Sequence, residues 1–320
     1  MTRQMILGLS LDGQTAGDDF AAFAHQAREA ERGVLHFLSI SDDLGTPPAG
    51  AGRIEPISLM SGLSAVTSSI GLAVTITPAC TEPYNTARFF ASLDLISGGR
   101  SAWNFSAGIP ENAARDFGPI VPPPLHLAMA EEHLDVVQGL WDTWEDDTMV
   151  QDKRTGVFLD PDKLHTLDHK RKFYQVMGPL NLSRSPQGQP VIFHPDPPPA
   201  EHDLAARRAD VILITPASPQ EAAAICEDLK HRAIAAGRDP ARLSILAHLP
   251  NPDADTLRHW FTATPLDGFM ITATALPTFV DTVLPTLRSQ GLFRTTYAGQ
   301  TLRENLGLPK PRSRFAKPKP

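Results

Sequence analysis

Three polar residues stand near the ends of short apolar runs, where a bound molecule could reach them. Asp42 follows the second such run, Thr77 closes the third and Asn104 lies towards the end of the fourth. If the runs are parallel strands, their carboxyl ends meet at one edge, which is where α/β folds bind ligands. Plainer roles stay open: Asp42 as a cap, Thr77 as a partner for backbone, and Asn104 as a tie between loops.

Other kinds of catalytic chemistry lack their usual signatures. His165 and His169 are four residues apart, but the glutamate of the H-E-x-x-H motif is missing, so no metal site is predicted. The sequence has no Gly-x-Ser-x-Gly turn to present a serine nucleophile. Its two cysteines, Cys80 and Cys226, lie far apart, and no base is identified beside either of them.

The apolar runs alternate with longer amphipathic stretches along the chain. Runs of this length, bounded by polar or turn residues, are typical of strands that are buried on both faces of a parallel sheet. The runs are residues 5–11, 35–41, 70–77, 101–107, 190–194, 210–215, 243–249 and 268–274.

Helical stretches separate most of these runs. One of them, residues 83–97, begins at a proline and stops at the pair Gly98 and Gly99. Eight strands with intervening helices is the count of a (β/α)8 TIM barrel, which is an α/β fold. The rival is an open doubly wound sheet, but the glycine-rich phosphate loop that usually follows its first strand is absent. The barrel is therefore predicted.

Residues 145–189 interrupt the alternation. This stretch is polar and has no long helix, which is too much chain for a plain connection. We interpret it as an insertion after the fourth strand and its helix. If it folds back over the C-terminal face, it would help to cover the site there. The barrel domain, with this insertion, is expected to span residues 1–309.

Composition narrows the partners. The chain has 320 residues, a formal net charge of −7 and no basic face, so no nucleic-acid partner is predicted. Residues 310–320 are basic and rich in proline, and we expect them to form a flexible, solvated tail. No run approaches the roughly 18 apolar residues of a membrane span, and the N-terminus lacks the apolar core of a signal peptide. A cytoplasmic protein without a membrane partner is expected.

A longer pattern extends from Glu82 to Asn104. Its fixed points are Glu82-Pro83-Tyr84, Ala87-Arg88, Ala91-Ser92-Leu93-Asp94, Ser97-Gly98-Gly99-Arg100 and Trp103-Asn104. In this order they closely resemble the bacterial-luciferase-like flavin monooxygenases, in particular the group that contains nitrilotriacetate, pristinamycin and dibenzothiophene-sulfone monooxygenases. Further matching blocks run in order through roughly residues 5–310, although the chain is shorter than is usual for the group.

The resemblance implies an oxidoreductase of the monooxygenase class. Members of the group take reduced FMN from a separate flavin reductase and use it with O2 to oxygenate a small organic substrate. Asp42 matches the acidic residue that the group places near the flavin, and Thr77 stands where the group has a small hydroxyl residue. Asn104 is the best retained of the cofactor-binding candidates. The resemblance also implies a homodimer.

The loop after the fifth run departs from the group's pattern. The group has a small Gly-Ser-Ser-type loop there, whose N–H groups and hydroxyls hold the FMN phosphate. Here prolines 195, 197, 198 and 199 have no N–H to donate, and Asp196 would repel a phosphate. His194, if protonated, would partly compensate, and it is the fourth cofactor-binding candidate. The alternative is a flavin-poor barrel that serves as a non-catalytic binding or partner subunit, or that uses another small ligand.

Overall fold

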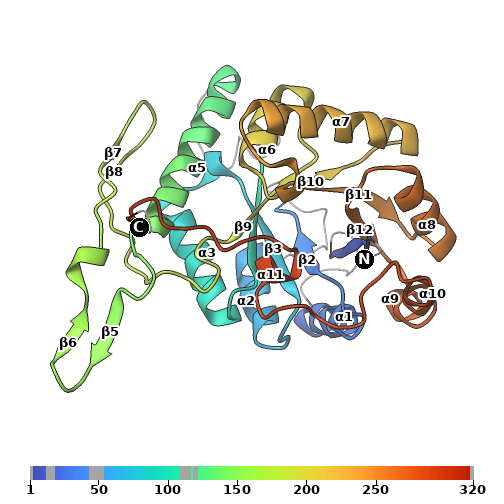
Figure 1. The fold of residues 1–320 in the computed structure, drawn as a ribbon, viewed down its shortest axis with the longest axis horizontal. Helices are drawn as coiled ribbons and strands as arrows, with labels where there is room; N and C mark the ends of the chain where they lie inside the picture. The colour runs from blue at the N-terminus through green and yellow to red at the C-terminus, as the bar shows by residue number, and fades with distance from the viewer. Residues whose placement is uncertain (1–2, 12–18, 43–53, 109–116, 118–121, 318–320) are drawn as a thin grey trace.

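A closed barrel of parallel strands forms the centre of the computed structural model, which describes residues 3–11, 19–42, 54–108, 117 and 122–317 (Figure 1). Around the barrel the order is β1-β2-β3-β4-β9-β10-β11-β12. The strands are β1 (Ile6–Ser10), β2 (Phe37–Ile40), β3 (Gly71–Ile76), β4 (Ser101–Phe105), β9 (Val191–Pro195), β10 (Val211–Ile214), β11 (Ser244–Pro250) and β12 (Gly268–Thr272). Each predicted apolar run supplies one of them, and the predicted (β/α)8 barrel is confirmed.

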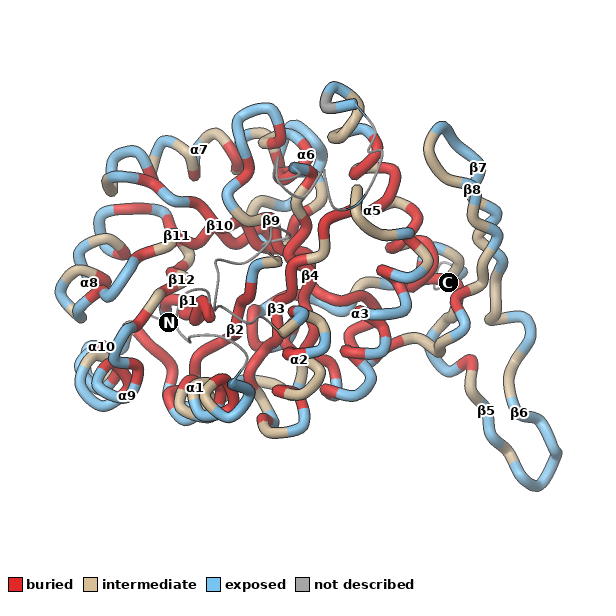
Figure 2. Tube along the Cα trace, turned by 180° about the vertical axis from the view of Figure 1, so that it is seen from behind, coloured by how far each residue is buried: buried red, intermediate tan, exposed pale blue. Residues whose placement is uncertain are grey.

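Helices surround the barrel, and Figure 2 shows the strands as its most buried part. They are α1 (Phe20–Arg32), α2 (Pro56–Ser64), α3 (Pro83–Ser97), α5 (His126–Asp142), α6 (His202–Arg208), α7 (Pro219–Ala235), α8 (Ala254–Ala263), α9 (Leu276–Thr278), α10 (Leu284–Ser289) and α11 (Leu302–Asn305). Within the described ranges, none of the helices has the length and the apolar composition that a membrane crossing requires.

The junction between α3 and β4 is fixed by two buried charges. Gly98 ends α3 in the left-handed conformation with φ 71°. The carboxylate of Asp94 accepts from the Ser101 hydroxyl at 2.9 Å and from Gln187 Nε2 at 2.6 Å. Arg100 is 2% exposed and donates to backbone oxygens of α2 and of the segment before β3. The charged residues of the pattern from Glu82 to Asn104 therefore hold the scaffold together rather than face a ligand.

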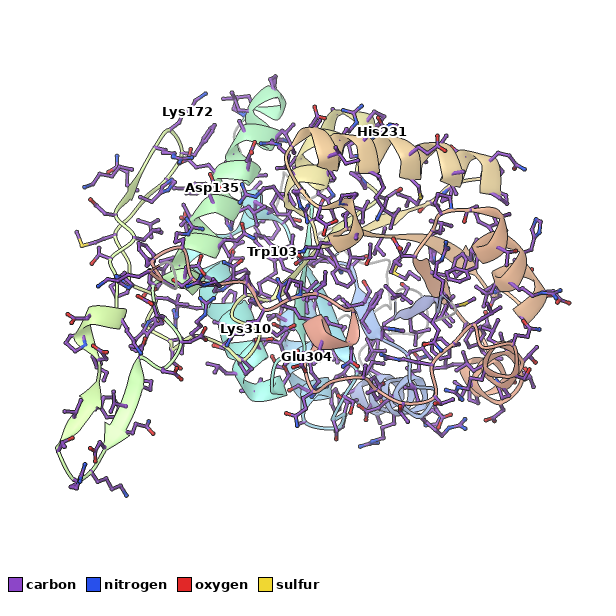
Figure 3. All side chains as sticks on the ribbon, in the orientation of Figure 1. Trp103, Asp135, Lys172, His231, Glu304 and Lys310 are labelled. Carbon is purple, nitrogen blue, oxygen red and sulfur yellow. The ribbon has the colours of Figure 1, made fainter. Side chains whose placement is uncertain are left out.

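The insertion lies beside α5 and not over the barrel mouth. It comprises two antiparallel hairpins, β5 (Met149–Asp152) with β6 (Val157–Leu159) and β7 (His169–Lys170) with β8 (Gln175–Val176). The β5–β6 hairpin projects away from the barrel in both ribbon and tube views (Figures 1 and 2). The β7–β8 hairpin runs along α5, and Lys172 lies at its tip (Figure 3). The possibility that the insertion covers the C-terminal face is thus limited to one side of the rim.

The C-terminal segment closes the N-terminal end of the barrel. Leu302, Leu306 and Leu308 join Phe37 and Ala73 in the apolar cluster inside the barrel. The side chain of Arg303 donates to the carbonyls of Gln189 and Pro190, just before β9 begins. In Figure 1 this segment crosses in front of the strands, so the opposite, C-terminal end is the one left for a ligand.

The basic tail differs from its prediction over residues 310–317. Ser313 is buried and donates to the carbonyl of Asp142 at 2.8 Å, and the Phe315 ring stacks on His165 at 4.7 Å. Arg314 Nε lies 3.1 Å from Asp142, whose carboxylate also accepts from Arg184 at 2.9 Å. The expectation of a solvated tail was wrong here, because the buried Asp142 attracts the basic side chains; residues 318–320 lie outside the described residues.

Candidate functional site

A polar layer lines the inside of the barrel towards the carboxyl ends of its strands. Asn104 pairs in register with Phe193 of the interior cluster, so its side chain points inward. Its Nδ2 donates to Ser39 Oγ at 3.0 Å and to Thr75 Oγ1 at 3.3 Å, and Thr75 in turn donates to the carbonyl of Ile40. Asn104 is 2% exposed, and among the described residues its Oδ1 has no hydrogen-bond partner. An orphaned, buried acceptor of this kind is uncommon and suits a donor on a bound molecule.

The far wall of the mouth carries a second polar pair. His248 Nε2 lies 2.8 Å from Thr272 Oγ1, which links β11 to β12. His248 stands two residues after Leu246 of the interior cluster and therefore faces the same way. Sequence reasoning missed this pair, although a polar residue that alternates with buried leucine in an apolar strand was a usable signal.

Asp42 and Thr77 lie at adjacent strand ends on the same side of the barrel as Asn104. Thr77 is 4% exposed, follows β3 directly and precedes the 3-10 turn η1 (Pro78–Cys80). Burial, and after it the negative charge of Asp42, raises the pKa of the Cys80 thiol, so Asp42 and Cys80 are close. The structure thus brings three of the four predicted residues to one sector of the mouth.

His194 faces the opposite way. It neighbours inward-facing Phe193 in β9, and its ring contacts Phe105 at 5.4 Å between the barrel and the helices. Its Nε2 is 3.3 Å from Glu201 Oε2, but within the described chain neither ring nitrogen has a partner in good hydrogen-bond geometry. His194 is therefore separated from Asn104 by the sheet itself.

The loop after β9 offers a phosphate no backbone donors between residues 195 and 199. Asp196 is the one residue there with an N–H, and that N–H donates to the carbonyl of Leu213 at 2.8 Å. Asp196 also holds a positive φ of 43° and places a carboxylate at this rim. The polar layer around Asn104 fits the edge of a flavin ring, whereas this loop does not fit a flavin phosphate.

A pocket of about 590 Å³ opens beside η1 and shares the sector of Thr77 and Asp42. Four aromatic rings and a thioether form much of its lining, and Glu82 contributes a carboxylate. The residues that supply these groups are Phe89, Phe117, Phe173, Tyr174, Met129 and Glu82. A concave site of this size with apolar walls and few polar groups is what small-molecule ligands use.

The wall formed by Phe173 and Tyr174 is held by α5. Glu132 accepts from the Phe173 and Tyr174 N–H groups at 3.2 and 2.9 Å and from His169 Nε2 at 3.1 Å. Burial alone would raise the pKa of Glu132, but these hydrogen bonds outweigh it and hold the pKa below its usual value. Burial also lowers the pKa of His133, which contacts the Tyr174 hydroxyl at 3.3 Å, to about 3. His133 is therefore neutral at physiological pH and positions the wall without exchanging protons.

A (β/α)8 barrel with a polar layer at its C-terminal mouth and an aromatic pocket beside it is the architecture of a barrel enzyme acting on a small molecule. The sequence profile of the family described as luciferase-like monooxygenase matches residues 5–256. The chain belongs to the luciferase-like monooxygenase family.

Relatives support the same assignment. The chain is 32% identical to N-acetyl-S-(2-succino)cysteine monooxygenase of Bacillus subtilis, over 92% of this chain and 91% of that protein. It is 32% identical to one of the subunits of pristinamycin IIA synthase from Streptomyces pristinaespiralis, over 97% of each. The crystal structure of long-chain alkane monooxygenase superposes with a TM-score of 0.88 at 21% identity, covering 96% of each chain, and shows the shared fold. The resemblance to the nitrilotriacetate, pristinamycin and dibenzothiophene-sulfone group is confirmed.

Chain length also agrees with the comparison. The alignment with the Bacillus protein extends over 402 positions, more than the 320 residues of this chain, so that relative holds segments which are missing here. The alignment with the Streptomyces protein extends over 312 positions. Shortened connections are therefore a feature shared with one branch of the relatives.

Proposed function

We propose that this chain is the oxygenating component of a two-component flavin monooxygenase. Reduced FMN, supplied by a separate flavin reductase, provides two electrons for O2; one oxygen atom enters a small organic substrate and the other leaves as water. The observation that carries the proposal is the buried, unpartnered Oδ1 of Asn104 at the mouth of a luciferase-like barrel. Monooxygenases that are named as components or subunits among the relatives support the two-component arrangement.

The residues of the mouth would divide the work of binding. Asn104 would accept from a ring N–H, with its amide held in place by Ser39 and Thr75. Thr77 and Asp42 would meet the ring edge from the ends of β3 and β2. The apolar floor formed by Phe37 and Phe193 would keep water from the lower face of the ligand. The proposal gives His194 no contact with the ring, because its side chain faces the helices.

Flavin titration tests this proposal. The purified chain should bind FMN, oxidised or reduced anaerobically, in the micromolar range, measured by flavin fluorescence or equilibrium dialysis. Because the loop after β9 has no free N–H, riboflavin should bind within about threefold of FMN, whereas a built phosphate site would favour FMN by about 100-fold. Absence of saturation by either flavin at high concentration would contradict the proposal.

A second candidate is a partner subunit that does not bind flavin itself. The near full-length match to a synthase subunit and the proline-rich loop after β9 favour it. The same titration separates the two functions, since a partner subunit would leave free flavin unchanged and acquire activity only with a second chain.

We also propose a homodimer. The β5–β6 hairpin exposes Val150, Val157 and Phe158, the last with 62% of its surface free, on a projection that contacts little of the barrel. Apolar side chains of this kind are commonly covered in assemblies. Phe158→Asp should shift the mass measured by light scattering after gel filtration towards a monomer. Ile234→Asp, an equally apolar and exposed site on α7, should not, and a monomeric wild type would refute the proposal.

A further inference from the structure

The pocket beside η1 is uneven in charge. Its lining, so far as the chain is described, includes no lysine, arginine or histidine, while Glu82 supplies a carboxylate. The nearest cations are engaged elsewhere: Arg88 contacts Asn85 Oδ1 at 3.4 Å, and Lys172 Nζ lies 5.0 Å from the centre of the Phe173 ring. A ligand carboxylate would enter this pocket without a counter-charge to replace its hydration.

Two further carboxylates add to the negative field. After burial, the charges of Glu82 and Glu132 raise the pKa of the Tyr174 hydroxyl, so both act at this wall. Asp42 acts in the same way on Cys80 at the opposite side of the pocket. The field therefore comes from three separate elements, the end of β2, the start of α3 and α5, and it disfavours an anion.

Aromatic surface is the other property of the pocket. Phe89 and Phe117 are 43% and 48% exposed, which is unusual for large apolar side chains outside a binding surface. Phe173 and Tyr174 are fixed opposite them through Glu132, so the wall is formed without a ligand. Ring faces bind apolar groups and attract cations.

We propose that this pocket is the substrate site of the monooxygenase and that it selects neutral or amine-bearing apolar molecules over carboxylates. The inference rests on the proposed function for its catalytic meaning, because Pro78 of the lining follows Thr77 of the flavin sector directly. Glu82 is its specificity-determining residue, and Glu132 is a positioning residue for the aromatic wall.

Ligand binding to the full chain without flavin tests the inference. Three probes share a ring and a chain length: 3-phenylpropylamine, 3-phenylpropan-1-ol and 3-phenylpropionate. Calorimetry or ligand-observed NMR should give the amine about a tenfold tighter dissociation constant than the acid, with the alcohol between them. Equal affinities, a preference for the acid, or no binding of any probe would overturn the inference.

Two variants assign the effect to the pocket. Glu82→Gln should reduce the amine-to-acid ratio about threefold, and it leaves the helix start intact because the Glu82 side chain makes no cap hydrogen bond. Glu131→Gln, on α5 and paired with Arg207, is the matched control and should leave the ratio unchanged. Asn85→Trp, at an exposed lining position, should abolish binding of all three probes. An unchanged ratio in Glu82→Gln, or probes that still bind Asn85→Trp, would refute the assignment.

The outcomes are separable from those of the flavin titration. Probes that bind with the expected order while flavin does not would retain the pocket and reject the monooxygenase. Flavin that binds while the probes show no preference would reject the specificity and retain the monooxygenase.

Discussion

Replacing Arg100 by methionine is expected to lower the free energy of unfolding by about 3–5 kcal/mol. The guanidinium is buried and donates to the carbonyls of Ser97, Ile70, Ser64 and Thr67 and to the Thr67 hydroxyl, at 2.7 to 3.1 Å. Methionine fills a similar volume but leaves these acceptors without a donor and out of reach of water. Chemical denaturation followed by circular dichroism measures the change.

A matched control separates burial from the loss of charge. Arg88 lies on the exposed face of α3 and makes one long contact to Asn85. Arg88→Met should change the free energy of unfolding by no more than about 0.5 kcal/mol. If Arg100→Met cost less than about 1 kcal/mol, the view that this arginine holds α2 and α3 to the barrel would be wrong.

The strands of this barrel were predictable because their signal is local. A strand buried on both faces needs apolar residues at nearly every position, and each of the predicted runs has them. The same property hides the direction of each side chain. His194 follows Phe193 in such a strand, and nothing in the run Val191–Pro195 shows which of the two faces the barrel interior. Register with β4, which only the folded sheet defines, places Phe193 inside and His194 outside.

Contacts between distant segments account for most of what sequence reasoning missed. The pair of His248 and Thr272 depends on the register of β11 against β12. Burial of the tail depends on Asp142, which lies 171 positions before Ser313 in the chain. The family pattern was recognisable, but its residues do different things: Asp94 and Arg100 hold the scaffold, and Asn104 faces the mouth. A pattern of residues identifies the scaffold without saying which of them meet a ligand.

Replacing Asn104 by leucine is expected to weaken flavin binding about 10- to 100-fold. Leucine has nearly the same volume, so the barrel interior stays filled, but it can neither accept from the ligand through Oδ1 nor hold Ser39 and Thr75. Fluorescence titration with FMN measures the loss. Ser39→Ala removes one support and keeps the acceptor, so its effect on flavin affinity should be several times smaller.

Stability distinguishes this role from a structural one. An asparagine that ties strands together would destabilise the fold when it is lost. The Oδ1 of Asn104, by contrast, has no partner among the described residues, and the Ser39 and Thr75 hydroxyls can rotate to other acceptors. Asn104→Leu should therefore leave the free energy of unfolding within about 1 kcal/mol of wild type, or raise it, as is common where a binding site is kept polar at the expense of stability. A variant that unfolds readily and binds flavin normally when folded would show that Asn104 serves the barrel and not the ligand.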